Sequence, residues 1–125
     1  MRASHEIKQR QKKFINEKLQ PLERIEYEGN YYHDFFRSLP FVALKQLLDR
    51  MSLSLNQKTV LVAGCGVGTD IHYLSKHYTG VEFIVCDLSE EAVKICIKNW
   101  PTARGYVEDI ERLTFADESF DFVFV

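Results

Sequence analysis

The spacing of hydrophobic residues changes once along the chain, about halfway. Before that point hydrophobic residues recur every three or four positions, which is the period of an amphipathic helix. This spacing predicts helices at about residues 4–22 and 39–51, and Pro40 suits the first turn of the second helix. We therefore expect an N-terminal helical segment over residues 1–55, followed by a different kind of unit over residues 56–125.

The second unit alternates short apolar runs with helical stretches. The apolar runs are bounded by glycine, proline or polar residues and are predicted to be strands; they are residues 59–63, 81–86, 103–107 and 119–125. Helices are predicted between the first three runs, at about residues 70–78 and 90–100, with Ser89 as the N-cap of the second. Ile71, Tyr73 and Leu74 are the candidates for the packing face of the first. This order is typical of α/β proteins, so we predict a Rossmann-like, mostly parallel sheet with flanking helices.

Three glycines follow the first predicted strand, in the segment Val60–Asp70 with the sequence VLVAGCGVGTD. Gly64, Gly66 and Gly68 permit main-chain angles that other residues rarely adopt, and they let a ligand approach the backbone. The helix expected after them begins with N–H groups that have no partner within the helix. The turn by itself favours a nucleotide-like ligand only weakly, because a structural turn explains the same glycines.

Acidic residues follow the next two predicted strands. Asp87 lies 19 residues after Gly68, and neighbouring parallel strands end side by side, so its carboxylate can accept bonds from ribose hydroxyls. Capping of the next helix is the alternative, but Ser89 suits that task. Asp109 follows the third strand and can accept a bond from an adenine amino group, with Ile110 packed on the ring; an exposed acidic turn is the alternative there.

With these residues in view, the chain resembles the class I S-adenosylmethionine-dependent methyltransferases, especially those that act on small molecules. Four segments match in order: the aromatic stretch before the first strand, VLVAGCGVG, IVCDLSEEAV and GYVEDIERLTFADESFDFVFV. The GCGxG core is more typical of these enzymes than of dinucleotide dehydrogenases, whose GxGxxG pattern needs glycine at Thr69. The resemblance covers about Tyr27–Val125 and implies transfer of a methyl group from S-adenosylmethionine to an acceptor, expected to be a small molecule.

The resemblance also implies which residues bind the cofactor. The glycine turn would line the methionine end, Asp87 would hold the ribose with Leu88 beside the adenine, and the pair after the third strand would hold the adenine. The full set is Gly64, Cys65, Gly66, Gly68, Asp87, Leu88, Asp109 and Ile110. Val62 stands where family members often carry an acid for the amino group of the cofactor, so that group needs another partner.

A few residues outside this set are minor candidates. Asp70 can contribute to the glycine turn. Tyr27, Tyr31 or Tyr32 can close over the cofactor, although packing explains these tyrosines as well. We assign no catalytic base; His33 is the one histidine that we consider for that role.

Composition narrows the class of protein further. The formal net charge of −2 gives no case for nucleic-acid binding, and a solvated helix face explains the basic cluster that includes Lys8. No apolar run approaches the roughly 20 residues of a membrane span, and the N-terminus lacks the apolar stretch of a secretory signal. Three cysteines without a CxxC pair predict neither a disulfide framework nor a metal site. We therefore expect a cytoplasmic protein without membrane or nucleic-acid partners.

The chain ends within its fourth predicted strand. Alternation there puts Phe120, Phe122 and Phe124 on one face and Val123 and Val125 on the other. Such a strand exposes an apolar sheet edge, so we expect the chain to be a fragment, truncated after this strand, that can associate with itself through it. The alternatives to a methyltransferase are an NAD-type dinucleotide-binding domain and a non-catalytic interaction module built on half of the fold.

Overall fold

The computed structural model describes residues 5–10, 13 and 31–125. Residues 5–10 are helical, and the long helix α2 (Tyr31–Arg50) precedes the alternating unit. The elements of that unit are, in order, β1 (Thr59–Ala63), α3 (Thr69–Leu74), β2 (Glu82–Asp87), α4 (Glu90–Asn99), β3 (Arg104–Val107), the short 3-10 helix η1 (Ile110–Arg112) and β4 (Phe122–Phe124). Among the residues that the structure describes, no helix is both long and apolar enough to cross a membrane.

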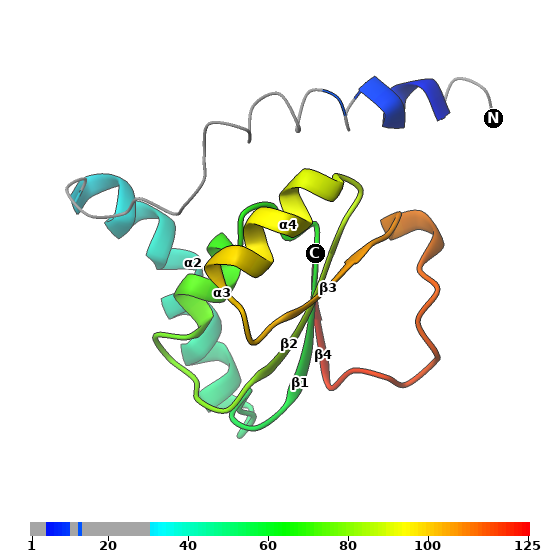
Figure 1. The fold of residues 1–125 in the computed structure, drawn as a ribbon. Helices are drawn as coiled ribbons and strands as arrows, with labels where there is room; N and C mark the ends of the chain where they lie inside the picture. Colours follow the sequence, from blue (N-terminus) through cyan, green and yellow to red (C-terminus); the bar gives the residue numbers. More distant parts are fainter. Residues whose placement is uncertain (1–4, 11–12, 14–30) are drawn as a thin grey trace.

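The four strands form one sheet in the order β3-β2-β1-β4, and every neighbouring pair is parallel. Starting at β1, the chain moves outward to β2 and β3 and then returns to the other side of β1 as β4 (Figure 1). The predicted Rossmann-like fold is therefore confirmed. This reversal of direction occurs at β1, and sheets of this kind bind ligands beyond the carboxyl ends of the strands at such a switch point.

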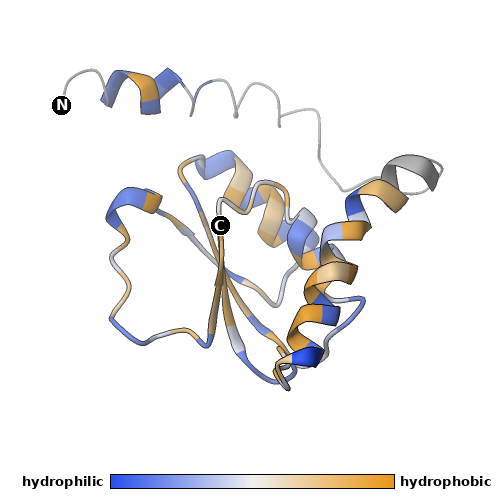
Figure 2. Ribbon diagram, turned by 180° about the vertical axis from the view of Figure 1, so that it is seen from behind, coloured by the Kyte–Doolittle hydropathy of each residue, from blue (hydrophilic) through white to orange (hydrophobic). Residues whose placement is uncertain are grey.

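Both faces of the central strands are buried. Val60 and Val62 of β1 belong to the larger core under α2, α3 and α4. Leu61 and Ala63 face the other side, where the loop between β3 and β4 covers them with Phe115 and Phe120. Figure 1 shows the helices and this loop on opposite sides of the sheet, and Figure 2 shows from behind that the strands are mostly hydrophobic. Hydrophobic residues on both faces explain why these strands lack a polar alternation.

Several local predictions are confirmed. Strand β1 has the predicted bounds, and the packing face of α3 consists of the predicted Ile71, Tyr73 and Leu74, all buried. The Ser89 hydroxyl accepts a hydrogen bond from the Ala92 N–H at 3.1 Å, as expected of an N-cap. These features depend on neighbouring residues, which is why the pattern of the sequence was sufficient.

Helix α2 begins earlier than predicted, at Tyr31 rather than near residue 39, and Pro40 lies inside it. Proline has no N–H to donate to the preceding turn, so the prediction placed it at the helix start. The helix tolerates that lost bond because its later turns pack Phe41, Leu44 and Leu48 onto the core. Only the backbone of the first turn, which contains Tyr32 and His33, is described. Tyr27 and much of the first predicted helix lie outside the described residues.

Helix α3 ends earlier than predicted, at Leu74 rather than near residue 78. The N–H groups of Lys76 and His77 bond to carbonyls three residues back, at 3.1 and 3.0 Å, which closes the helix in a tight turn. The prediction was wrong at this end because no proline or glycine marks the stop.

The predicted fourth strand is also too long, and one of its side chains is on the opposite face. Pairing of this segment with β1 begins at Asp121, whose N–H donates to the Thr59 carbonyl and whose carboxylate accepts the Thr59 N–H, both at 2.9 Å. Phe120 precedes this pairing and packs beside Leu61, whereas Phe122 packs on the helix side. Strand alternation does not apply to Phe120, because that residue belongs to the loop.

Candidate functional site

The glycine turn lies at the carboxyl end of β1. Gly64, Gly66 and Gly68 have φ angles of +74°, +52° and +93°, which lie in the left-handed region that favours glycine. The N–H groups of Gly64 and Cys65 donate to the Cys86 carbonyl at 2.8 and 3.0 Å. These bonds fix the start of the turn to the end of β2.

The space above the first two glycines is open. A methyl group added at Gly66 would meet no atom within 4 Å, and one at Gly64 would meet only the Ile110 Cδ1 atom, at 3.6 Å. A ligand can therefore lie directly on the main chain of the turn. Gly68 differs, because a methyl group there would lie 2.6 Å from the Trp100 ring. Packing against α4 thus requires Gly68, and its contact with a ligand stays a prediction.

Asp87 ends β2 and joins the glycine turn to the turn before α4. One carboxylate oxygen accepts the Gly66 N–H at 3.1 Å and the other accepts the Ser89 N–H at 2.9 Å. Sequence reasoning did not foresee either bond. Each carboxylate oxygen has two lone pairs, so each keeps a position that a hydroxyl group can use. Asp87 is only 7% exposed, so only a ligand that lies directly against the glycine turn can reach these positions.

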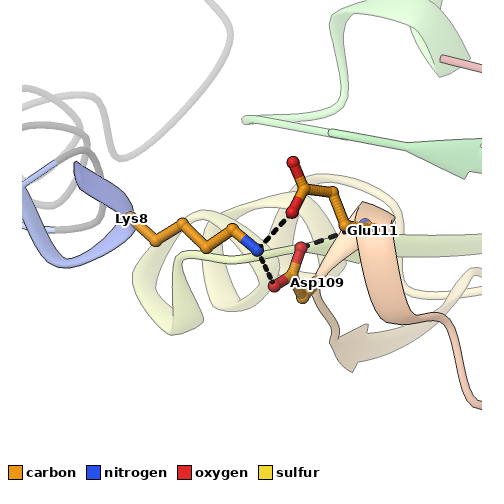
Figure 3. Close-up of polar contacts among 3 residues, drawn as sticks. All are labelled: Lys8, Asp109 and Glu111. Atoms are coloured by element: carbon orange, nitrogen blue, oxygen red, sulfur yellow. Dashed lines mark hydrogen bonds and ion pairs between the residues drawn. The ribbon is translucent and has the colours of Figure 1, made fainter. Parts of the chain in front are cut away.

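Asp109 and Ile110 follow β3 and lie at the same end of the sheet, beyond the carboxyl ends of its strands. The Asp109 Oδ1 atom accepts the Glu111 N–H at 3.0 Å, and the Oδ2 atom lies 2.7 Å from the Lys8 ammonium (Figure 3). The hydrogen bond from Lys8, and then that from the Glu111 N–H, holds the pKa of Asp109 below its usual range. Ile110 is 45% exposed beside Gly64, so an apolar surface adjoins the glycine turn.

Cys65 lies between the first two glycines of the turn. Its side chain is buried, and its thiol shares a hydrogen bond with the Cys96 thiol that, together with burial, raises the pKa of Cys65 far above its usual value. Cys65 therefore stays protonated near neutral pH and is not a nucleophile. All three cysteines of the chain are free thiols.

Comparison with known proteins identifies the family. The methyltransferase domain family matches residues 60–125, from the first strand of the sheet through the glycine turn to β4. The chain belongs to the methyltransferase domain family. The resemblance to class I S-adenosylmethionine-dependent methyltransferases is thereby confirmed. No match was found among curated proteins.

Solved structures agree with the fold of this methyltransferase domain. The PH0226 protein of Pyrococcus horikoshii is 24% identical over 78% of this chain and 44% of its own, with a TM-score of 0.55. Coclaurine N-methyltransferase, solved with N-methylheliamine and SAH, is 16% identical over 66% of this chain and 25% of its own, with a TM-score of 0.52. At these identities the likeness shows the fold alone. The chain spans less than half the length of either protein.

A third similar structure is a complex between the Trm112 methyltransferase activator of Haloferax volcanii and a methyltransferase. It is 27% identical over 54% of this chain and 31% of its own, with a TM-score of 0.49. Agreement at that level adds nothing to the assignment of the fold.

The structure also shows three residues in contact with the candidate site that sequence reasoning missed. The Asn99 side chain donates to the Val67 carbonyl at 3.1 Å and so holds the glycine turn from α4. Trp100 packs beneath Gly68, and Lys8 reaches Asp109 from 101 residues away. No local signal marks these three residues, because each acts on a segment distant in the sequence.

The remaining candidates differ in exposure. Leu88 is half-buried beside Asp87, whereas Val62 is completely buried in the core and cannot contact a ligand. Asp70 lies in the first turn of α3, where burial raises the pKa of its carboxyl group. In the part of the chain that the structure describes, its carboxyl group has no hydrogen-bond partner.

Proposed function

We propose that this chain forms the S-adenosylmethionine-binding part of a methyltransferase that methylates a small molecule in the cytoplasm. The observation that carries the proposal is the shared position of three features at one edge of the sheet. They are the open main chain at Gly64 and Gly66, the Asp87 carboxylate, and the pair Asp109 and Ile110. An adenosyl group has an apolar ring, an amino donor and two hydroxyl donors, and this edge offers a matching surface for each.

The residues of the chain bind and orient the cofactor in this proposal. The glycine turn carries the methionine end on its main chain, Asp87 accepts the ribose hydroxyls, and Ile110 supports the adenine ring beside Leu88. The bound sulfonium supplies a methyl group that is already activated. The chain therefore contributes alignment and exclusion of water rather than a chemically reactive side chain.

Asp70 is our proposed partner for the amino group of the cofactor. Val62, at the position where related enzymes carry an acid, is fully buried and cannot reach a ligand. Asp70 is the only acidic residue from Gly64 to the first turn of α3. A half-buried carboxylate whose pKa is raised by burial gains stability when a cation approaches.

General features of the sequence support the proposed acceptor class and compartment. The motifs are most similar to those of small-molecule methyltransferases, and the net charge of −2 does not suit a nucleic-acid substrate. Three free thiols suit a reducing compartment.

Isothermal titration with S-adenosylhomocysteine and with NAD tests this proposal. We expect the chain to bind S-adenosylhomocysteine and not NAD. Binding of NAD alone would instead identify a dinucleotide-binding domain, and a folded chain that binds neither ligand would point to an interaction module.

A matched pair of glycine variants tests the position of the site. Gly66→Ala puts a methyl group into the open space above the turn, and we expect affinity for S-adenosylhomocysteine to fall at least about tenfold. Gly80→Ala is the control, because Gly80 has a similar φ of +65° but lies before the amino end of β2. Both variants bear the strain of a left-handed residue, about 1–2 kcal/mol, and Gly80→Ala adds a contact of 3.1 Å with the Gln57 Cγ atom. Equal losses of affinity would contradict the proposed site.

A further inference from the structure

Lys8, in the helical residues near the N-terminus, contacts the candidate site although about 100 residues separate the two in sequence. The Lys8 ammonium lies 2.7 Å from the Asp109 Oδ2 atom and 2.6 Å from the Glu111 Oε2 atom. Figure 3 shows the lysine side chain extended toward both carboxylates, and Figure 1 shows residues 5–10 beyond the carboxyl ends of the strands. The basic residue that the sequence assigned to a solvated helix face is therefore paired with an acid of the proposed adenine site.

Lys8 pairs with the carboxylate that we propose as acceptor for the adenine amino group. Asp109 Oδ1 already accepts the Glu111 N–H, so Oδ2 is the oxygen turned toward other donors. The Lys8 ammonium and the amino group of adenine are both hydrogen-bond donors. A positive charge on Oδ2 also reduces the strength with which that oxygen accepts a second, neutral donor. Oδ2 keeps a second lone pair, but the bound ammonium makes it a poorer acceptor, so the two donors compete through the strength of their bonds to this oxygen.

Glu111 gives Lys8 an alternative partner. Its side chain is 69% exposed, and the Lys8 ammonium already touches it. A small movement of the lysine away from Asp109 keeps one ion pair intact while it frees the Oδ2 atom. Movement of Lys8 away from Asp109 therefore costs only the part of its interaction energy that comes from Asp109.

We propose that Lys8 is an autoinhibitory contact, which occupies Asp109 in the cofactor-free chain and moves onto Glu111 alone when the adenine amino group binds. The proposal rests on the proposed function, since it assumes that Asp109 receives adenine. It makes the N-terminal segment a regulator of cofactor affinity: any partner that captures Lys8 strengthens cofactor binding.

Removal of the charge at Lys8 tests the competition. Lys8→Met keeps most of the aliphatic stem, and we expect it to tighten S-adenosylhomocysteine binding about two- to fivefold, the range of exposed ion pairs. Lys94→Met is the matched control, since it removes the same charge from an exposed pair with Glu90 on α4. Its affinity should stay that of the wild type. Weaker binding by Lys8→Met would mean that Lys8 supports the bound cofactor, and would overturn the proposal.

A ligand without the adenine amino group tests whether Lys8 competes with that group. The analogue with unsubstituted purine in place of adenine lacks the amino group and has no N–H on its six-membered ring, so it donates no bond to Asp109. We expect Lys8→Met to give no gain for this analogue. An equal gain for both ligands would show that Lys8 acts through general charge, and would also overturn the proposal.

A measurement without ligand separates this proposal from the proposed function. The hydrogen bond from Lys8 is the main reason that the pKa of Asp109 is lowered. We expect Lys8→Met to raise that pKa when the carboxyl carbon is followed by NMR. An unchanged pKa would overturn the contact itself. A raised pKa in a chain that binds no S-adenosylhomocysteine would reject both the proposed function and the inhibitory role, while the ion pair stands.

Discussion

Substitution of Asp87 by alanine separates the two roles that the structure suggests for this residue. Its carboxylate accepts the N–H groups of Gly66 and Ser89, and we propose that it also accepts two ribose hydroxyls. Asp87→Ala removes all four bonds at once. The effects on folding and on binding differ in size and are measured separately.

The expected loss of stability depends on how deeply the two N–H groups are buried. Ser89 is completely buried, so the loss of the Asp87 oxygen that accepts its N–H costs about 1–3 kcal/mol. Gly66 is only half-buried, and water can replace part of its lost bond. We expect the free energy of unfolding to fall by roughly 2–4 kcal/mol, measured by urea denaturation.

The binding loss follows from two hydroxyl-to-carboxylate bonds. Such a charge-assisted pair contributes on the order of 2–3 kcal/mol, so the dissociation constant should rise about 30- to 160-fold. Isothermal titration with S-adenosylhomocysteine measures this change. Ser89→Ala is the control: it loses the N-cap bond to Ala92 and about 1 kcal/mol of stability, but keeps the Asp87 carboxylate and the wild-type affinity.

A ligand without ribose hydroxyls distinguishes direct contact from a disturbed glycine turn. The wild-type chain should bind the 2′,3′-dideoxy analogue of S-adenosylhomocysteine as weakly as Asp87→Ala binds either ligand. If Asp87→Ala instead loses the same factor for both ligands, Asp87 acts only through Gly66 and the reasoning is wrong.

Three further predictions follow from other parts of the structure. Gly68→Ala places a methyl group 2.6 Å from the Trp100 ring at a φ of +93° and should destabilise the chain by about 2–5 kcal/mol in urea denaturation; wild-type stability would show that the ring moves aside freely. Burial raises the pKa of Asp70, so its folded form disfavours the charged carboxylate, and stability is lost as pH rises from the unfolded pKa of about 3.9 through the folded one. Asp70→Asn should therefore be more stable than the wild type at pH 7 but not at pH 3, by thermal unfolding, and should bind S-adenosylhomocysteine more weakly; equal stability at both pH values would contradict the sign. Val123 is 53% exposed on β4, an edge of the described sheet, so Val123→Lys should suppress concentration-dependent association in analytical ultracentrifugation if that edge pairs between chains, and persistent association would assign it to another surface.

The sequence by itself determined those features whose causes lie within a few residues. Strand β1 could be bounded because TVLVA is apolar throughout and is followed by glycine. The Ser89 N-cap and the packing face of α3 depend on side chains three or four positions apart. The order of these elements predicted the parallel sheet, and hence that the glycine turn and Asp87 meet at one edge. The family followed from the same motifs.

Only the tertiary structure decided which atoms of distant segments contact one another. Asp87 contacts Gly66 across 21 residues, and Lys8 contacts Asp109 across 101 residues. Phe120 changed faces because pairing with Thr59 begins one residue later. Hydrophobic periodicity reports which side of an element is buried, but it carries no information on which polar atom will lie opposite another. The glycine turn could therefore be predicted as a ligand site, whereas its support by Asn99 and the competing charge of Lys8 required the folded chain.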